Sequence, residues 1–91
     1  PDQALELMNG KLILEWSRRF AARVANDRGL DQAGQAERAL RLAYARPPRA
    51  EEIAAAAAFL DKQEKLAASP EEALADLCHT LLSSTEFLYI Q

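Results

Sequence analysis

The chain has 91 residues, 49% of them hydrophobic and 27% charged, and its net charge is −3. This composition indicates one globular domain near the lower size at which a chain folds alone, and it excludes a disordered chain. The single cysteine excludes an internal disulfide, and no apolar run approaches the ~20 residues of a membrane-spanning helix.

The charge is distributed unevenly along the chain. Residues 1–50 carry nine basic and six acidic side chains, whereas residues 51–91 carry two basic and eight acidic ones. A nucleic-acid-binding domain is normally strongly basic, so the overall acidic balance argues against a nucleic-acid partner. The asymmetry instead favours a solvated surface on which basic helices lie beside acidic ones.

Scarce glycine and abundant Ala, Leu, Glu and Arg predict an all-α fold. We expect a single domain over residues 1–91, a compact bundle of about five helices with a docked aromatic C-terminal tail. A short first helix follows Asp2 and ends at Asn9 and Gly10, where glycine supplies a left-handed stop. The second helix covers residues 11–28. Its inner stripe has i, i+4 spacing and consists of Leu12, Trp16, Phe20 and Val24, and Ile13 widens it.

Proline marks the boundary between the third and fourth helices. Asp31 caps the third helix, which we expect to continue through Arg46. Pro47 and Pro48 then force a stop, because the residue before a proline is pushed out of the helical region. The fourth helix covers residues 50–67, and its first turn carries acidic side chains that oppose the positive end of the helix dipole.

The fifth helix has the clearest start. Ser69 is its N-cap, Pro70 occupies the first helical position, and Glu72 completes a capping box. Its inner face consists of Leu74, Leu77, Cys78 and Leu81. The predicted helices share one core, which includes Trp16, Phe20, Leu40, Tyr44, Leu60, Leu77 and Leu81.

The last eleven residues, 81–91, are the most informative stretch. After a polar break they carry four large apolar residues, Phe87, Leu88, Tyr89 and Ile90. Exposing such a cluster invites aggregation, so we expect the tail to dock on this domain or on another part of the protein. Arg46 and Glu86 are opposite charges in the two least ordinary stretches, and we predict that they approach each other and fix the tail.

The adjacent Cys78 and His79 raise the question of a metal or haem site. A c-type haem needs Cys-x-x-Cys-His, and Ala75 stands where the first cysteine belongs. A structural zinc site needs four such ligands, and the chain has only two. With one histidine and no Gly-rich phosphate loop, the sequence predicts no catalytic residue, no metal site and no cofactor. We therefore do not expect an enzyme.

Binding is then the expected activity. The candidate interaction surface is formed by large side chains of the second helix, Trp16, Arg18, Arg19 and Arg23. The competing interpretation is structural: tryptophan is typical of a core, and arginine stems often cover apolar surface while their charges stay in water.

Three motifs carry a family resemblance. They are Leu7-Met8-Asn9-Gly10 with Leu14-Glu15 and Arg18-Arg19; Arg46-Pro47-Pro48 with Glu51-Glu52-Ile53; and Leu81-Leu82 with Glu86-Phe87-Leu88-Tyr89. With them the chain resembles the C-terminal end of a planctomycete domain of unknown function, which occurs in exported multidomain proteins that also carry planctomycete cytochrome-c-like domains. Ala45, Ser83 and Thr85 depart from the family pattern. The structural motif candidates that this resemblance supplies are Asn9, Arg46, Pro47, Pro48, Glu86, Phe87 and Tyr89.

The resemblance implies an extracytoplasmic location, periplasmic or at the cell surface, and a larger parent protein, but no known activity. We expect a non-catalytic C-terminal module that serves domain packing or protein–protein interaction. Its partners would be upstream domains of the same chain, other proteins, or a second copy through weak self-association. Two alternatives remain open: a lid or dock for an upstream redox or hydrolytic domain, and a polyanion- or glycan-binding module.

Overall fold

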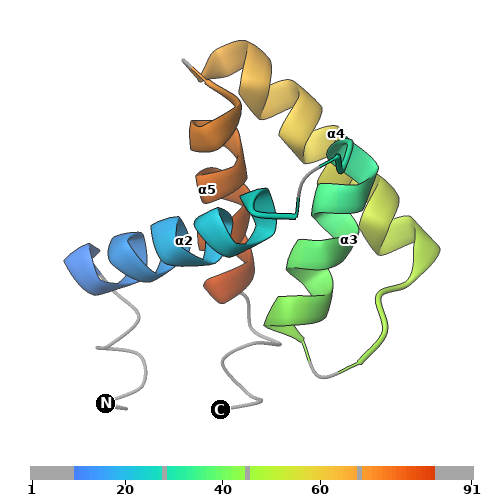
Figure 1. The fold of residues 1–91 in the computed structure, drawn as a ribbon, viewed down its shortest axis with the longest axis horizontal. Helices are drawn as coiled ribbons and strands as arrows, with labels where there is room; N and C mark the ends of the chain where they lie inside the picture. The colour runs from blue at the N-terminus through green and yellow to red at the C-terminus, as the bar shows by residue number, and fades with distance from the viewer. Residues whose placement is uncertain (1–9, 28, 45, 68, 84–91) are drawn as a thin grey trace.

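A computed structural model describes residues 10–27, 29–44, 46–67 and 69–83, and these residues form helices and no strand. The helices are α2 (Gly10–Ala25), α3 (Gln32–Ala43), α4 (Ala50–Leu66) and α5 (Pro70–Leu82) (Figure 1). The predicted all-α class is confirmed. The predicted helix over residues 2–9 and the aromatic tail lie outside the described residues, so the count of five helices and the docking of the tail stay predictions.

The predicted starts of α3 and α5 are confirmed by their hydrogen bonds, whereas Gly10, predicted as a left-handed stop, is instead the first residue of α2. The Asp31 carboxylate accepts from the Gly34 backbone N–H at 2.8 Å, and the Ser69 hydroxyl accepts from the Glu72 N–H at 3.2 Å. Each bond satisfies a first-turn donor that has no partner within its own helix. Gly29, in the turn before α3, has a φ of +83°, a conformation that side chains with a Cβ rarely adopt.

Two helix ends come earlier than predicted. α2 ends at Ala25 rather than at residue 28, because its last turn tightens: the Asp27 N–H donates to the carbonyl of Val24, three residues back. α3 ends at Ala43 rather than at residue 46, because Tyr44 adopts an extended backbone with φ −119° and ψ 153°. α3 therefore ends three residues before Arg46, the residue that directly precedes Pro47.

The helices pack in sequence order, with α2 closing the assembly (Figure 1). α3 packs against α4, α4 packs against α5, and α2 crosses α5. One core draws on all four helices. Its buried members are Ala21, Val24, Ala36, Ala39, Leu40, Ala43, Ala56, Leu60, Ala73, Leu74, Leu77, Cys78 and Leu81.

Small side chains set the spacing of this core. Ala36, Ala39 and Ala73 have no exposed surface at all. Because a methyl group projects so little, helices that meet through alanine can approach more closely than helices that meet through leucine. The radius of gyration of 12.7 Å is close to the ~12 Å expected of a compact chain of this length. The alanine-rich composition therefore allows these helices to pack closely.

The buried stripe of α2 shares Ile13 and Val24 with the predicted one but has Ser17 and Ala21 in place of Trp16 and Phe20. Ile13, Ser17, Ala21 and Val24 are buried, whereas Trp16 keeps 37% of its surface exposed. The Ser17 hydroxyl donates to the Ile13 carbonyl at 2.6 Å, which makes its burial possible. The prediction that Trp16 belongs to the core is therefore wrong, and the largest side chain of α2 lies on its flank.

The other predicted core residues divide into two groups. Leu40, Leu60, Leu77 and Leu81 are buried in the main core, as predicted. Phe20 and Tyr44 are only partly buried and pack against its margin. Phe20 also contacts a second, smaller buried pair, Ile13 and Leu82. It therefore links the main core to the end of the molecule where α5 terminates.

Candidate functional site

The α2 helix separates the candidate interaction residues onto two flanks. Trp16, Arg19 and Arg23 lie on the flank toward α3 and the C-terminal end of α5, whereas Arg18 lies on the opposite flank. This division follows from helical geometry, since Trp16, Arg19 and Arg23 lie three or four residues apart and Arg18 does not share that spacing. The predicted single surface is thus two surfaces, each next to its own groove.

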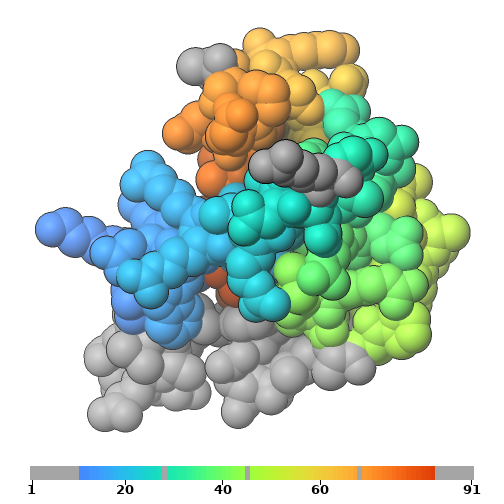
Figure 2. Space-filling model, in the orientation of Figure 1, coloured from blue at the N-terminus to red at the C-terminus, as the bar shows by residue number. Residues whose placement is uncertain are grey.

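The larger groove lies between α2 and the N-terminal half of α5, where the molecular surface is notched (Figure 2). We call it the α2–α5 groove. Its volume is about 400 Å³. Its lining consists of Arg18, Ala21, Ala22, Ala25, Asn26, Glu71, Glu72, Leu74 and Ala75. Five of these nine side chains are alanine or leucine, so most of its surface is apolar.

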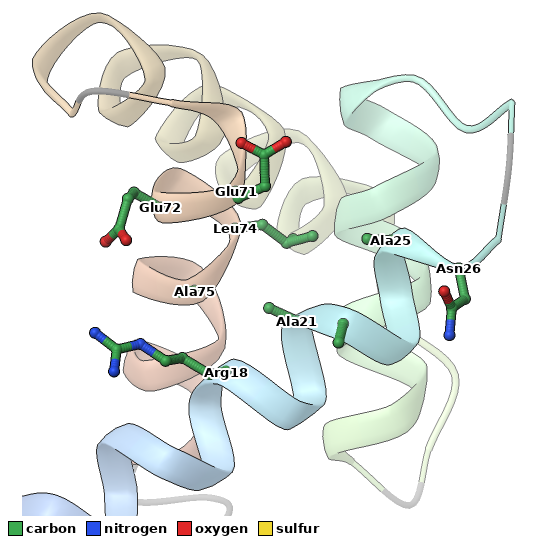
Figure 3. Close-up of a pocket in the computed structure, with 9 residues that line it drawn as sticks. Arg18, Ala21, Ala25, Asn26, Glu71, Glu72, Leu74 and Ala75 are labelled. Carbon is green, nitrogen blue, oxygen red and sulfur yellow. The ribbon is translucent and has the colours of Figure 1, made fainter.

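Opposite charges stand on the two walls of the α2–α5 groove (Figure 3). Arg18 projects from α2, while Glu71 and Glu72 project from the first turn of α5. The carboxylates also compensate the positive end of the α5 dipole, so their presence needs no ligand. The groove nevertheless offers an apolar floor between a basic and an acidic wall. That arrangement suits a polypeptide surface better than a small reactive substrate.

The smaller groove, which we call the Trp16 groove, lies on the other flank of α2. Its volume is about 260 Å³. Its apolar lining consists of Trp16, Phe20, Leu42, Ala43 and Leu82, and its basic lining consists of Arg19 and Arg23. Among the described residues of this lining, the two charged side chains are both basic. The groove joins α2, α3 and the last residue of α5.

A third, small cavity gathers polar groups that sequence analysis did not bring together. It has a volume of about 60 Å³, and its lining includes Ser17, Glu72, Asp76 and His79. The Ser17 hydroxyl donates to the Ile13 carbonyl, and the Asp76 carboxylate accepts from Gln63 at 3.1 Å. Each bond ties the group to the fold. In the sequence, the three-residue spacing of Asp76 and His79 indicates that these two side chains lie on the same face of a helix.

The geometry of this cavity does not resemble that of a nucleophilic triad. The Ser17 hydroxyl is directed to its own helix, and the space is far below the roughly 300–1,000 Å³ of small-molecule sites. Within the part of the chain that the structure describes, no group of three or more His, Cys, Asp and Glu side chains is arranged to hold a metal ion.

Cys78 is fully buried, and burial raises the pKa of its thiol to about 12. Because the thiolate is the reactive form, we expect the native thiol to react with a maleimide or a disulfide reagent at least about a thousandfold more slowly than the thiol of the urea-unfolded chain. Stopped-flow labelling with and without urea measures the ratio. Comparable rates in the two states would mean that Cys78 is accessible and that the α5 packing is wrong.

The predicted motif around the proline corner forms a local clamp. The Arg46 guanidinium donates to both carboxylate oxygens of Glu52, at 2.8 and 2.7 Å, and lies over the Tyr44 ring at 5.5 Å from its centre. Glu52 also accepts from the Arg49 backbone N–H at 2.8 Å. These bonds join the end of α3 to the start of α4 across Pro47 and Pro48.

Several motif candidates fall outside this clamp. Asn9, Glu86, Phe87 and Tyr89 lie outside the described residues, so the predicted approach of Arg46 to Glu86 is untested. The pairing of Arg46 with Glu52 was missed in the sequence, although the six-residue spacing across a rigid proline corner was visible.

A family comparison accounts for most of the chain. The family described as "Protein of unknown function (DUF1553)" matches residues 1–60, that is, 60 of 91 residues. The chain belongs to this family. DUF1553 membership confirms the predicted resemblance. The match includes the first two resemblance motifs, at residues 7–19 and 46–53, and does not extend to the third at 81–89.

No curated protein and no solved structure matches the chain. None of the helices among the described residues is both long enough and apolar enough to cross a membrane.

Proposed function

We propose that this domain is a non-catalytic packing module of a larger exported protein, and that a neighbouring domain of the same chain packs into the α2–α5 groove. The observation that supports the proposal is the groove itself, an apolar floor of alanine and leucine between a basic and an acidic wall. Interfaces between domains have this composition, with apolar area at the centre and charged groups at the rim.

The surface beside the groove supports the same proposal. Leu14 lies one helical turn before Arg18 on α2 and keeps 48% of its surface exposed. An exposed leucine that adjoins an apolar groove extends the area available to a partner. The two walls also favour one orientation, because a partner would place acidic groups near Arg18 and basic groups near Glu71 and Glu72.

The alternative of polyanion or glycan binding has less support. Arg38 pairs with Asp27 at 2.7 Å, and Arg41 pairs with Glu37 at 3.0 Å. Arg46 is bonded to Glu52. The arginine-rich part of the sequence therefore presents less uncompensated positive charge than its composition indicates. A lid or dock for a redox or hydrolytic domain would use the same α2–α5 groove, with a catalytic neighbour as its occupant.

A charge inserted into the groove tests the proposal. Ala22 lines the groove and is exposed, so Ala22→Arg leaves the core intact while it blocks the floor. We expect this variant to weaken binding to the separately produced preceding domain of the parent protein by at least about tenfold, equivalent to ~1.4 kcal/mol. Isothermal titration calorimetry provides the measurement.

The matched control is Ala33→Arg. Ala33 is also an exposed alanine within a helix, but it lies on α3, outside the groove lining. It should leave the affinity unchanged. Equal effects of the two variants, or no binding by the unaltered chain, would contradict the packing role. Turnover of a hydrolysable or redox substrate by this chain alone would contradict the non-catalytic assignment.

A further inference from the structure

The Trp16 groove begins where α5 ends. Leu82 is the last residue of α5, is 7% exposed and lines the groove. The chain therefore leaves its last described helix at the edge of an apolar surface. The groove needs no distant partner to be filled, because the segment that follows α5 starts beside it.

We propose that the Trp16 groove is the docking site of the chain's own residues 84–91. The segment contains Phe87, Leu88, Tyr89 and Ile90 and a single charged side chain, Glu86. Eight residues reach at most about 27 Å when extended, and Leu82, which the segment closely follows, itself lines the groove. The covalent link also raises the local concentration of the segment to the millimolar range, so that a weak intrinsic contact suffices.

The two surfaces are complementary in both polarity and charge. The walls contributed by Trp16, Phe20 and Leu42 suit aromatic and aliphatic side chains. Arg19 and Arg23 lie four residues apart at the rim, where they can receive the carboxylate of Glu86.

The position of the only tryptophan makes the proposal measurable. Trp16 lines the groove, so its fluorescence reports on occupancy. We expect a chain that ends at Ser83 to show red-shifted Trp16 emission and greater quenching by acrylamide than the full chain. A synthetic peptide of residues 84–91 should reverse both changes saturably. If the shortened chain fails to fold by circular dichroism, the full-length double variant Phe87→Ala, Tyr89→Ala takes its place and should show the same greater exposure.

Charge reversal at single positions of α2 tests which of the two grooves binds the peptide. Arg19→Glu should raise the dissociation constant of the peptide about tenfold, whereas Arg18→Glu, on the opposite flank of the same helix, should leave it unchanged. Equal effects of the two variants would overturn the proposal. A Trp16 fluorescence signal that does not change when residues 84–91 are removed would also overturn the proposal. A signal that depends on protein concentration would overturn it too, because it would identify a second copy of the chain as the occupant.

A failure of this docking proposal can be distinguished from a failure of the proposed packing role. The docked segment and the neighbouring domain use opposite flanks of α2. Removal of residues 84–91 should therefore leave binding at the α2–α5 groove unaffected, and Ala22→Arg should leave the Trp16 fluorescence unaffected.

Discussion

Replacement of Leu60 by alanine is expected to lower the free energy of unfolding by about 2–5 kcal/mol. Leu60 is 1% exposed on α4 and belongs to the core shared by all four helices. Many of its fellow core residues are alanines, whose short side chains cannot extend into the space that a lost isobutyl group leaves. A small domain has a total stability of only about 5–15 kcal/mol, so this loss is a large fraction of it. Urea denaturation followed by circular dichroism measures it.

The control lies on the same helix. Leu66 is 72% exposed, so Leu66→Ala removes little buried surface and improves helix propensity slightly. We expect a change within about 0.5 kcal/mol. A cost for Leu60→Ala below ~1 kcal/mol, or equal to that of Leu66→Ala, would mean that α4 does not face the core as described.

The features that sequence analysis predicted best are those that depend on neighbouring residues alone. The caps at Asp31 and Ser69 need a side-chain oxygen and an N–H three residues on, and both are visible in the sequence. Gly29 was expected as a stop because a left-handed turn favours the residue without a Cβ. Helix type, order and starting points follow from such local rules.

The orientation of α2 was the main error, and it has a physical cause. Two neighbouring i, i+4 stripes compete on this helix, one through Leu12 and Trp16 and one through Ile13 and Ser17. Hydrophobicity favours the first. The packing favours the second, in which Ile13 packs against Leu82 of α5 and the Ser17 hydroxyl is satisfied within its own helix. Tertiary packing and a local hydrogen bond outweighed hydropathy here.

The grooves were beyond sequence reasoning for a related reason. Arg18 and Arg19 are adjacent in the chain, and their opposite flanks become evident only when the core-facing side of α2 is known. The facing wall of the α2–α5 groove comes from Glu71 and Glu72, more than fifty residues away. A groove depends on how two helices cross, which no local pattern encodes.

The second large expected effect on stability concerns the Arg46–Glu52 clamp at the proline corner. Glu52 accepts two hydrogen bonds from Arg46 and one from the Arg49 backbone. Glu52→Gln keeps the shape but removes the charge, and hydrogen bonds to charged groups contribute about 1.5–3 kcal/mol. The Arg46 and Glu52 side chains are 30% and 24% exposed, so solvent screens part of this. We expect a loss of about 1–2 kcal/mol, against less than about 0.5 kcal/mol for the control Glu51→Gln, an exposed residue of the same turn.

The pH dependence of that loss identifies the charge as its cause. The hydrogen bonds from Arg46, followed by the one from the Arg49 backbone, lower the pKa of Glu52 from 4.5 to about 2. The unfolded chain therefore takes up this proton first, so the stabilisation is complete above pH 4.5 and is lost as the pH falls toward 2. We expect the stability gap between the unaltered chain and Glu52→Gln to be constant near neutral pH and to shrink across that window in urea titrations. A gap that persists undiminished at the acid end would mean that the Glu52 side chain stabilises the corner by its shape, and not by its charge.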